Sequence, residues 1–306
     1  MKRSFNRFSH QPGQSPFYLL INPSAAGFSR KKIDYLTNEL KGAGKQFHSV
    51  DITSFDQALV QLKGIVQRHP EAIIACGGDG TVNLAAQTLI RRTTGLGIFP
   101  LGRFNNIYFS LHGKPNLSRS VEHILSGQSK KIDHGLASGR FFLGSVGLGL
   151  IPEIFEHINK GRVPRFGLGW SRLAAQSAAA VSAKEVSIKI DSFRFDLMPR
   201  LLNINLLPYS VGLPIAPACI DDDGKGEVIF DIGHDKAILS SFIRMIYKKK
   251  YIYSDEIRMF RGSKITISPI PRSKLYIDGE IVEHPLDVLE IEFFEKKIRI
   301  LHSSGH

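Results

Sequence analysis

Residues 73–83 constrain the fold more than any other stretch, because the apolar segment Ile73–Cys76 runs directly into the turn Gly77-Gly78-Asp79-Gly80-Thr81. This order predicts a buried strand, a glycine turn and the first turn of a helix. Backbone amides at the start of a helix, together with the helix dipole, attract anions such as phosphate. Glycine lets a phosphate approach the backbone because it has no Cβ. The sequence therefore predicts a phosphate-binding turn.

Asp79 is the carboxylate of this turn. It is not expected to hold phosphate, because like charges repel. We interpret it as a group that holds Mg²⁺ on a nucleotide or accepts a proton from an attacking hydroxyl. The alternative is an ordinary tight turn, in which Gly and Asp are common. Four of the five turn positions fit a phosphate site, so we favour the functional interpretation.

The first part of the chain alternates between strand-like and helix-like segments. The strand-like segments are apolar and lie at 17–21, 47–52, 72–76 and 96–99. Between them, residues with helical spacing predict helices at 30–42, after residue 54 and at 81–91. Ser29 is expected to cap the first helix, and Thr53 or Ser54 the second. Such alternation predicts a parallel sheet with helices on both faces. Ligands of such sheets bind at the carboxyl ends of the strands, so we expect the turns 22–27, 77–81 and 100–106 to meet at one site.

The pattern changes after residue 128. Strand-like segments then follow one another, at 130–136, 141–150, 186–190, 193–198, 201–207, 227–232, 257–260, 264–268, 274–277, 288–293 and 298–301, with helical stretches at about 151–181 and 236–247. This order predicts an antiparallel sandwich or barrel. The predicted fold is an N-terminal parallel-sheet α/β nucleotide-binding domain, residues 17–128, followed by an antiparallel β-sandwich domain, residues 129–302. Residues 1–16, polar and basic, are predicted to be a flexible tail.

Composition narrows the possible partners. The formal net charge of +12 favours an anionic partner, but no zinc-finger spacing and no RNA-binding aromatic motif occurs, so no nucleic acid is expected. No apolar run approaches the ~18 residues of a membrane span, and the N-terminus has no apolar signal region. The two Cys residues favour the cytoplasm. The 11 His show no zinc spacing and are interpreted as ordinary surface or core residues.

Several short motifs, taken together, resemble one enzyme family. In chain order they are Asn22-Pro23-Ser24-Ala25-Ala26-Gly27, the turn at 77–81 continuing to Asn83, Pro100-Leu101-Gly102-Arg103-Phe104-Asn105-Asn106, Lys131-Ile132-Asp133, Ile220-Asp221-Asp222-Asp223-Gly224 and Asp278-Gly279-Glu280. In kind and order they resemble the diacylglycerol kinase catalytic-domain family, which includes bacterial lipid kinases and sphingosine kinases. The resemblance extends over about residues 17–302.

The resemblance implies an ATP-dependent lipid kinase that phosphorylates the hydroxyl of a lipid alcohol, such as diacylglycerol or a sphingoid lipid. It implies ATP and Mg²⁺ as cofactors, and a site in the cleft between the two domains. The implied nucleotide-binding residues are Asn22, Pro23, Ser24, Thr53, Gly77, Gly78, Asp79, Gly80, Thr81, Asn83, Gly102 and Asn105.

The resemblance also assigns roles to carboxylates of the second domain. Either Asp278 or Glu280 is implied as the base that activates the lipid hydroxyl; from the residues alone, Asp-Gly also favours a hairpin turn. Ile220 and Asp223 are implied as a magnesium site, with a solvated acidic loop as the equal alternative.

Two positions depart from the family pattern. Arg103 stands where the family has Thr, and Asn106 where it has Asp. An arginine can neutralise phosphate charge, as in other phosphoryl-transfer enzymes, or it can fill the pocket and abolish binding. A degenerate family member that binds lipid or nucleotide without turnover therefore stays open, and a NAD kinase-like enzyme is a more distant alternative.

Two segments are candidates for membrane contact. Residues 237–247 have helical apolar spacing and precede Lys248–Lys250, and residues 161–170 are basic, aromatic and rich in glycine. A basic amphipathic helix can lie on anionic lipid, although a helix packed in the core with a charged end is the alternative. We expect a cytoplasmic protein with peripheral contact to an anionic membrane, and a possible homodimer through exposed strand edges.

Overall fold

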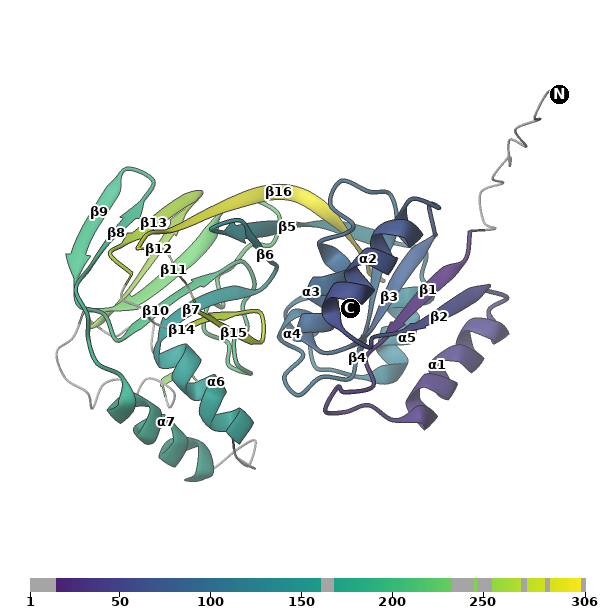
Figure 1. Cartoon of the computed structure of the whole chain (residues 1–306), viewed down its shortest axis with the longest axis horizontal. Helices are drawn as coiled ribbons and strands as arrows, with labels where there is room; N and C mark the ends of the chain where they lie inside the picture. The colour runs from purple at the N-terminus through teal and green to yellow at the C-terminus, as the bar shows by residue number, and fades with distance from the viewer. Residues whose placement is uncertain are drawn as a thin grey trace.

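The computed structural model describes residues 15–160, 168–232, 245–246, 255–270, 274–283 and 287–303. The predicted tail at 1–16 and the candidate membrane segments at 161–170 and 237–250 lie wholly or largely outside these residues. The described chain forms an α/β part and a mostly β part, joined by one long strand (Figure 1).

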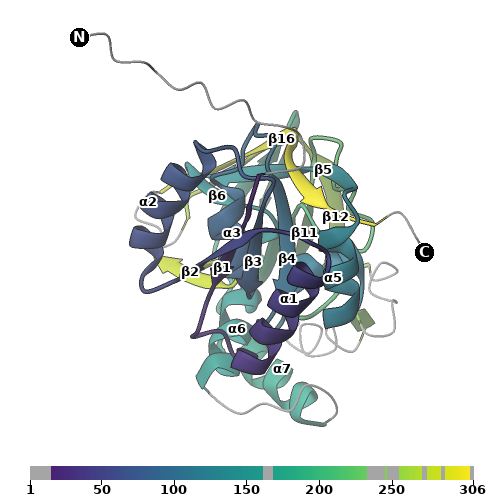
Figure 2. The ribbon, with the colours of Figure 1, turned by 90° about the vertical axis from the view of Figure 1, so that its right-hand side faces the viewer.

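The α/β part contains the parallel sheet that the sequence predicts. Its strands are β1 (Phe17–Ile21), β2 (Phe47–Asp51), β3 (Ala72–Gly77) and β4 (Gly95–Pro100), in the spatial order β2-β1-β3-β4. Helices cover both faces, as the end-on view in Figure 2 shows. One face packs against α1 (Arg30–Gly42) and α5 (Leu117–Leu125), and the other against α2 (Phe55–Val66), α3 (Asp79–Ala86) and α4 (Asn106–His112).

Strand β3 illustrates why this sheet forms. Every residue of β3 is buried, with Ile73 and Ala75 in the core on the side of α2 and α3, and Ile74 and Cys76 in the core on the side of α1 and α5. A parallel strand covered by helices on both faces needs such a continuous apolar run.

The β part is a sandwich. Its strands are β5 (Ser129–Ala137), β6 (Arg140–Phe142), β7 (Ser145–Gly149), β8 (Val186–Ile190), β9 (Phe193–Leu197), β10 (Leu201–Asn205), β11 (Gly226–Asp231), β12 (Ile257–Gly262), β13 (Lys264–Ser268), β14 (Lys274–Ile277), β15 (Glu280–Glu283) and β16 (Leu289–Leu301). One sheet is antiparallel throughout, in the order β12-β11-β10-β7-β14-β15. Its inner face shares a core with β8, β13 and β16, and its outer face packs against α6 (Leu150–Lys160) and α7 (Leu168–Ala180).

Strand β16 connects the two parts (Figure 1). It pairs antiparallel with β5 and β13, and near its end Ile300 pairs parallel with Leu96 of β4. The parallel strands and half of the sandwich thus belong to one 10-stranded sheet. The sequence predicted two strands here, whereas the structure has one strand with an irregularity between Phe294 and Ile298. The division near residue 128 stays a prediction, because the last strand belongs to both parts.

Some local predictions were wrong. The segment 141–150 was expected to be a single strand, but it breaks at Leu143 and Gly144, and a helix begins at Leu150. The helix after the glycine turn ends at Ala86 rather than near residue 91. Ser54 caps α2 by accepting a hydrogen bond from the backbone of Gln57, but the side chain of Ser29 makes no cap hydrogen bond to α1.

We searched the described residues for a helix long and apolar enough to cross a membrane, and found none.

Candidate active site

The glycine turn is tied to the loop that follows β1. A Cβ at Gly77 would collide with the side chain of Thr81, so only glycine fits there. The Thr81 hydroxyl accepts a hydrogen bond from Asn22 Nδ2 at 3.1 Å, and Asn22 Oδ1 accepts one from the backbone of Ser24 at 3.0 Å. These contacts hold the loop after β1 against the first turn of α3.

The loop after β4 packs against the loops after β1 and β3. Within this loop, the side chain of Asn105 folds back on Gly102: its Oδ1 accepts from Gly102 N–H at 2.7 Å, and its Nδ2 donates to the Gly102 carbonyl at 3.0 Å. A Cβ at Gly102 would collide with Cα of Gly78, so the two glycine loops approach as only glycines can. The structure therefore brings together the loops after β1, β3 and β4.

Asp79 lies at the start of α3 and is only 8% exposed. Its Oδ1 accepts from the backbone N–H of Ile107 at 2.8 Å, and its Oδ2 accepts from Asn106 Nδ2 at 3.1 Å. The Oδ1 of Asn106 in turn accepts from Gly212 N–H at 2.8 Å. Asn at position 106, in place of the family Asp, thus puts a neutral donor beside Asp79 where a second carboxylate would repel it.

Burial raises the pKa of Asp79 to about 6. The hydrogen bonds from Ile107 and Asn106 oppose this shift, whereas the negative charge of Asp278 adds to it. Near neutral pH the ionised carboxylate is therefore held at a free-energy cost, and a bound cation would lower that cost.

This cost predicts a pH-dependent effect of Asp79→Asn on stability. A carboxyl whose folded pKa is raised from 3.8 to about 6 stabilises the fold below pH 3.8, and this contribution is lost as the pH rises through about 6. Because Asn does not ionise, we expect D79N to gain about 3 kcal/mol of unfolding free energy relative to wild type over this range. Urea unfolding of both proteins at a series of pH values measures the difference, and a difference independent of pH would contradict the prediction.

A hairpin from the second sheet closes the site. Asp278 and Gly279 form the turn between β14 and β15, with φ angles of 44° and 91°. A Cβ on Gly279 would lie 3.8 Å from Cβ of Asp79, so this turn packs directly against the glycine turn. The contact joins residues far apart in the sequence.

Asp278 is 4% exposed, and protein donors surround its carboxylate. Its Oδ1 accepts from Gly144 and Ser145 N–H, both at 2.8 Å. Its Oδ2 accepts from Leu143 N–H at 2.6 Å and from Asn83 Nδ2 at 2.9 Å. Burial raises the pKa of Asp278, and these hydrogen bonds oppose the shift. The arrangement fixes the hairpin on α3 and on the break between β6 and β7.

Glu280 is placed differently. Its side chain is 41% exposed, and its Oε2 pairs with Arg140 Nη2 at 2.5 Å. Its Oε1 faces the glycine turn, 3.8 Å from where a Cβ on Gly80 would lie, and the ring of Phe55 is 3.7 Å from the same point. Of the two candidate carboxylates, Glu280 is the one that a substrate in solution can reach.

Arg103 reaches across to the second part of the chain. Its Nη1 donates to the Ile158 carbonyl at 2.7 Å and to Asn159 Oδ1 at 3.3 Å, both in the last turn of α6. A cation is favoured at this end of a helix. The next side chain, Phe104, lies 6.3 Å from the ring of Phe155 on the same helix. In this structure the guanidinium is directed to α6, which supports neither a phosphate contact nor a filled pocket.

This orientation predicts the behaviour of Arg103→Thr, which restores the family residue. We expect ATP affinity to stay within about threefold of wild type, a difference of less than about 1 kcal/mol, because the guanidinium contacts α6 and not the glycine loops. The free energy of unfolding should fall by about 1 kcal/mol, because hydrogen bonds to α6 are lost. Equilibrium ATP binding and urea unfolding test the two effects. A loss of ATP affinity of tenfold or more would instead place the guanidinium on a phosphate.

The acidic loop at 221–223 makes contacts of another kind. Asp221 Oδ2 pairs with Lys130 Nζ at 2.6 Å, and Asp223 Oδ2 with Arg261 Nη2 at 2.6 Å. Ile220 is 45% exposed. Cations thus already pair with these carboxylates, and the magnesium site at Ile220 and Asp223 stays a prediction beside the alternative of a solvated acidic loop.

Other predicted residues lie at the margin. Thr53 is exposed and its hydroxyl donates to Gln57 Oε1 at 2.8 Å, and Pro23 and Ser24 are exposed on the loop after β1. Sequence reasoning missed the amides of Leu143–Ser145 and the side chain of Arg140. The glycines at 144, 147 and 149 could have signalled a break in the predicted strand 141–150, but nothing in the sequence signalled Arg140.

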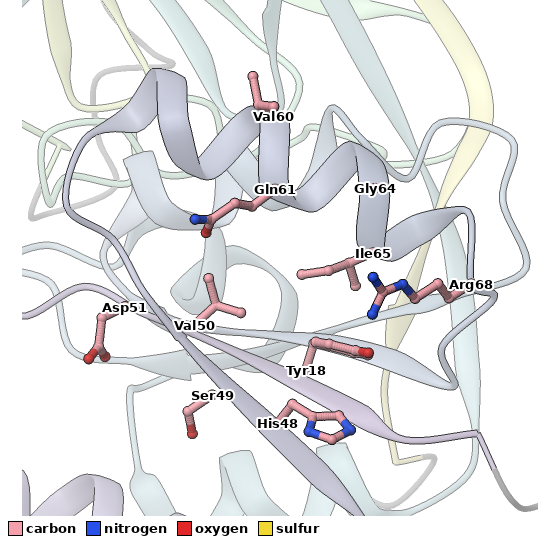
Figure 3. A pocket seen from close by; sticks show the side chains of 10 residues that line it. All are labelled: Tyr18, His48, Ser49, Val50, Asp51, Val60, Gln61, Gly64, Ile65 and Arg68. Carbon is pink, nitrogen blue, oxygen red and sulfur yellow. The ribbon is translucent and has the colours of Figure 1, made fainter.

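A groove of about 660 Å³ lies away from these loops (Figure 3). It runs between the edge strand β2 and helix α2, and its lining includes Tyr18, His48, Val50 and Ile65. None of the glycine-loop or hairpin residues lines it, so the groove is separate from the candidate active site.

Solved structures share the arrangement of the two sheets. The crystal structure of a diacylglycerol kinase from Bacillus anthracis matches with a TM-score of 0.74 at 18% identity, covering 96% of this chain and 99% of that chain. Yeast NADH kinase complexed with NADH matches with a TM-score of 0.52 at 9% identity, covering 96% and 85%. The fold is that of the diacylglycerol kinase-like proteins.

The sequence comparisons find similar proteins in one family. Residues 16–137 match the family model of the diacylglycerol kinase catalytic domain. The diacylglycerol kinase of Bacillus subtilis is 25% identical over 276 residues, covering 86% of this chain and 88% of the relative. That of Staphylococcus carnosus is 21% identical over 267 residues, covering 86% and 87%. The predicted resemblance is confirmed: residues 16–137 match the model of this family, and relatives that cover most of the chain are named diacylglycerol kinase.

Proposed function

We propose that this protein transfers the γ-phosphoryl group of ATP to the hydroxyl of a lipid alcohol. One observation carries the proposal: the buried carboxylate of Asp79, at the start of α3, lies against the hairpin that presents Glu280. A phosphate-binding turn, a carboxylate suited to Mg²⁺ and a reachable second carboxylate meet at one place. Phosphoryl transfer needs such positioning and charge neutralisation more than covalent chemistry.

The loops after β1, β3 and β4 would hold the nucleotide. The backbone amides of Asp79 and Gly80 in the first turn of α3 would donate to phosphate oxygens, whereas Thr81 N–H already donates to the Gly78 carbonyl at 3.0 Å. Gly78 and Gly102 let the two loops pack against each other, and Asn22 and Asn105 would keep the flanking loops in place. Asp79 fits a divalent cation, because its ionised form is buried and unfavourable without one. Mg²⁺, when bound, would neutralise phosphate charge and orient the transferred group.

Glu280 is the proposed base. It would accept the proton of the lipid hydroxyl while the hydroxyl oxygen bonds to the γ-phosphorus, and the bond to the β-phosphate oxygen would break to release ADP. Asp278 suits this role poorly, because backbone and side-chain donors already occupy both of its oxygens. We assign it a positioning role: it holds the hairpin so that Glu280 faces the glycine turn.

A transfer assay tests the proposal. Purified full-length protein is incubated with γ-labelled ATP, Mg²⁺ and a panel of micelle-presented lipid alcohols that includes diacylglycerol, a sphingoid base and ceramide, with D79N in parallel. Label that enters a lipid with wild type, and not with D79N, is the expected result, and it also identifies the acceptor. If ATP or lipid binds but no acceptor is labelled, the protein is better described as a degenerate family member that binds without turnover.

The other proposals need a wider acceptor panel and two further measurements. NAD and NADH join the acceptor panel, because the fold also resembles yeast NADH kinase. The net charge of +12 supports peripheral contact with an anionic membrane, which sedimentation with anionic and neutral vesicles tests. We further propose a cytoplasmic location, and a homodimer is an open proposal for light scattering.

A further inference from the structure

One short segment of the chain contacts both carboxylates of the β14–β15 hairpin. It begins with Arg140, the first residue of β6, and ends with the amides of Leu143–Ser145. The amides bind the carboxylate of Asp278, and the guanidinium of Arg140 pairs with the carboxylate of Glu280. Asp278 is buried and needs its donors, whereas Glu280 is half-exposed. The pairing of Glu280 with Arg140 therefore needs a reason other than burial.

The backbone at Arg140 is held in place. A tight turn at Ser138 and Gly139, with φ angles of 47° and 83°, reverses the chain so that Arg140 pairs with Ala137 of β5. The backbone N–H of Ser138 donates to the Glu290 carbonyl of β16 at 2.7 Å. The two residues that follow Arg140 are buried phenylalanines. The guanidinium thus extends from a fixed position on the sandwich.

Glu280 has less support of its own. It begins β15, which is the edge strand of its sheet in the described part of the chain. A half-exposed glutamate on an edge strand can adopt several rotamers. The contact of its Oε2 with Arg140 Nη2 at 2.5 Å restricts the side chain to one of them, in which Oε1 faces Gly80 of the glycine turn.

The charges of the site make this restraint important for the proposed reaction. The carboxylates of Asp79 and Asp278 lie close enough that the charge of Asp278 raises the pKa of Asp79. Bound ATP would add the charge of its phosphates at the same turn, and repulsion between like charges would drive ionised Glu280 away from it. The guanidinium of Arg140 offsets this repulsion, and its planar array of donors also fixes the orientation of the carboxylate.

We propose that Arg140 is the positioning residue of the base, an inference that rests on the proposed function. By holding Oε2 of Glu280, Arg140 leaves Oε1 as the oxygen that accepts the proton of the acceptor hydroxyl. Arg140 acts only through Glu280, so its loss costs no more than the loss of the base itself. Misplacing a catalytic group by about 1 Å can lower a rate by about a hundredfold.

A double-mutant cycle in the transfer assay tests the inference. Wild type, R140Q, E280Q and the double variant are compared, with ATP and the acceptor lipid varied in turn. We expect R140Q to lower kcat by about tenfold to a hundredfold, and by less than E280Q does, with the KM for ATP within about twofold of wild type. In the E280Q background, R140Q should change kcat by less than about twofold, because no base remains to be positioned.

Two further variants serve as controls. R140K keeps the charge but not the planar donors, so we expect it to recover part of the kcat that R140Q loses. Arg194 forms a comparable exposed pair with Asp196 on β9, at 3.1 Å and outside the site, so R194Q should behave as wild type. Urea unfolding of R140Q checks that the loss of kcat is not a loss of folded protein.

Three results would overturn the inference. Wild-type kcat in R140Q would show that the pair has no role in transfer. An equal fold-loss of kcat in the wild-type and E280Q backgrounds would show that Arg140 acts independently of Glu280, for instance on the transferred phosphate. If wild type binds ATP but labels no acceptor, the proposed function fails and this inference fails with it. In the first two results wild type does transfer phosphate, so the two failures are distinguishable.

Discussion

Asp79→Asn is expected to reduce phosphoryl transfer by at least about a thousandfold, equivalent to about 4 kcal/mol of activation free energy. The carboxylate lies at the start of α3 among the glycine loops, where the charge of a nucleotide and its Mg²⁺ would be held. Asn keeps the size of the side chain and can still accept the hydrogen bond from Ile107 N–H, but it removes the negative charge that a cation needs. The measurement is kcat with the acceptor lipid that the transfer assay identifies.

The fold should survive this change. Since ionised Asp79 is unfavourable in the fold, D79N at neutral pH should not unfold more readily than wild type, so that lost activity is not lost structure. Asp56→Asn is the matched control, because Asp56 is exposed in the first turn of α2. Wild-type kcat in D79N would show that Asp79 only links α3 to the first turn of α4.

Glu280→Gln is expected to lower kcat by about a hundredfold to ten-thousandfold, the range for loss of a general base. Gln cannot accept the proton of the lipid hydroxyl, although it retains the length and polarity of Glu. The KM for ATP should change little, because Glu280 lies on the hairpin β14–β15 and not on the three loops that would hold the nucleotide. Steady-state kinetics with ATP and lipid varied in turn separates the two effects.

Glu283→Gln is the control for this prediction, because Glu283 is exposed on the same strand, β15. It should behave as wild type. A raised KM for ATP with unchanged kcat in E280Q would count against Glu280 as the base and would assign it to nucleotide binding. Unfolding curves for both variants check that the hairpin remains intact.

The sequence was sufficient for the order of strand, glycine turn and helix from residue 72, although not for the end of the helix at Ala86. Their burial and turn chemistry are local, since an apolar run forms the strand and glycines favour the turn that follows it. Alternation also predicted the parallel sheet correctly. The break at Leu143 and Gly144 was not predictable, because the reason for it is the distant carboxylate of Asp278 that binds those amides.

The candidate site shows the same limit. Both carboxylates of the Asp278-Gly279-Glu280 motif were candidates for the base, and only burial separates them: Asp278 is enclosed by donors while Glu280 stays reachable. The two possibilities for Arg103 were phosphate neutralisation and pocket filling. The sequence did not predict the contact that the structure shows, in which Arg103 donates to the last turn of α6. Periodicity gives no information on which helix lies opposite a loop.

The sequence by itself determined the strand and glycine turn at residues 72–81, the class of each half of the chain and the resemblance to a family, because these depend on residue type and local spacing. Tertiary structure alone decided which distant residues meet. It placed Asp278 on Asn83 across 195 residues and His302 beside His112 across 190. Such pairs are fixed by the packing of strands such as β16 on both parts of the fold, and packing of this kind leaves no periodic signal in the chain.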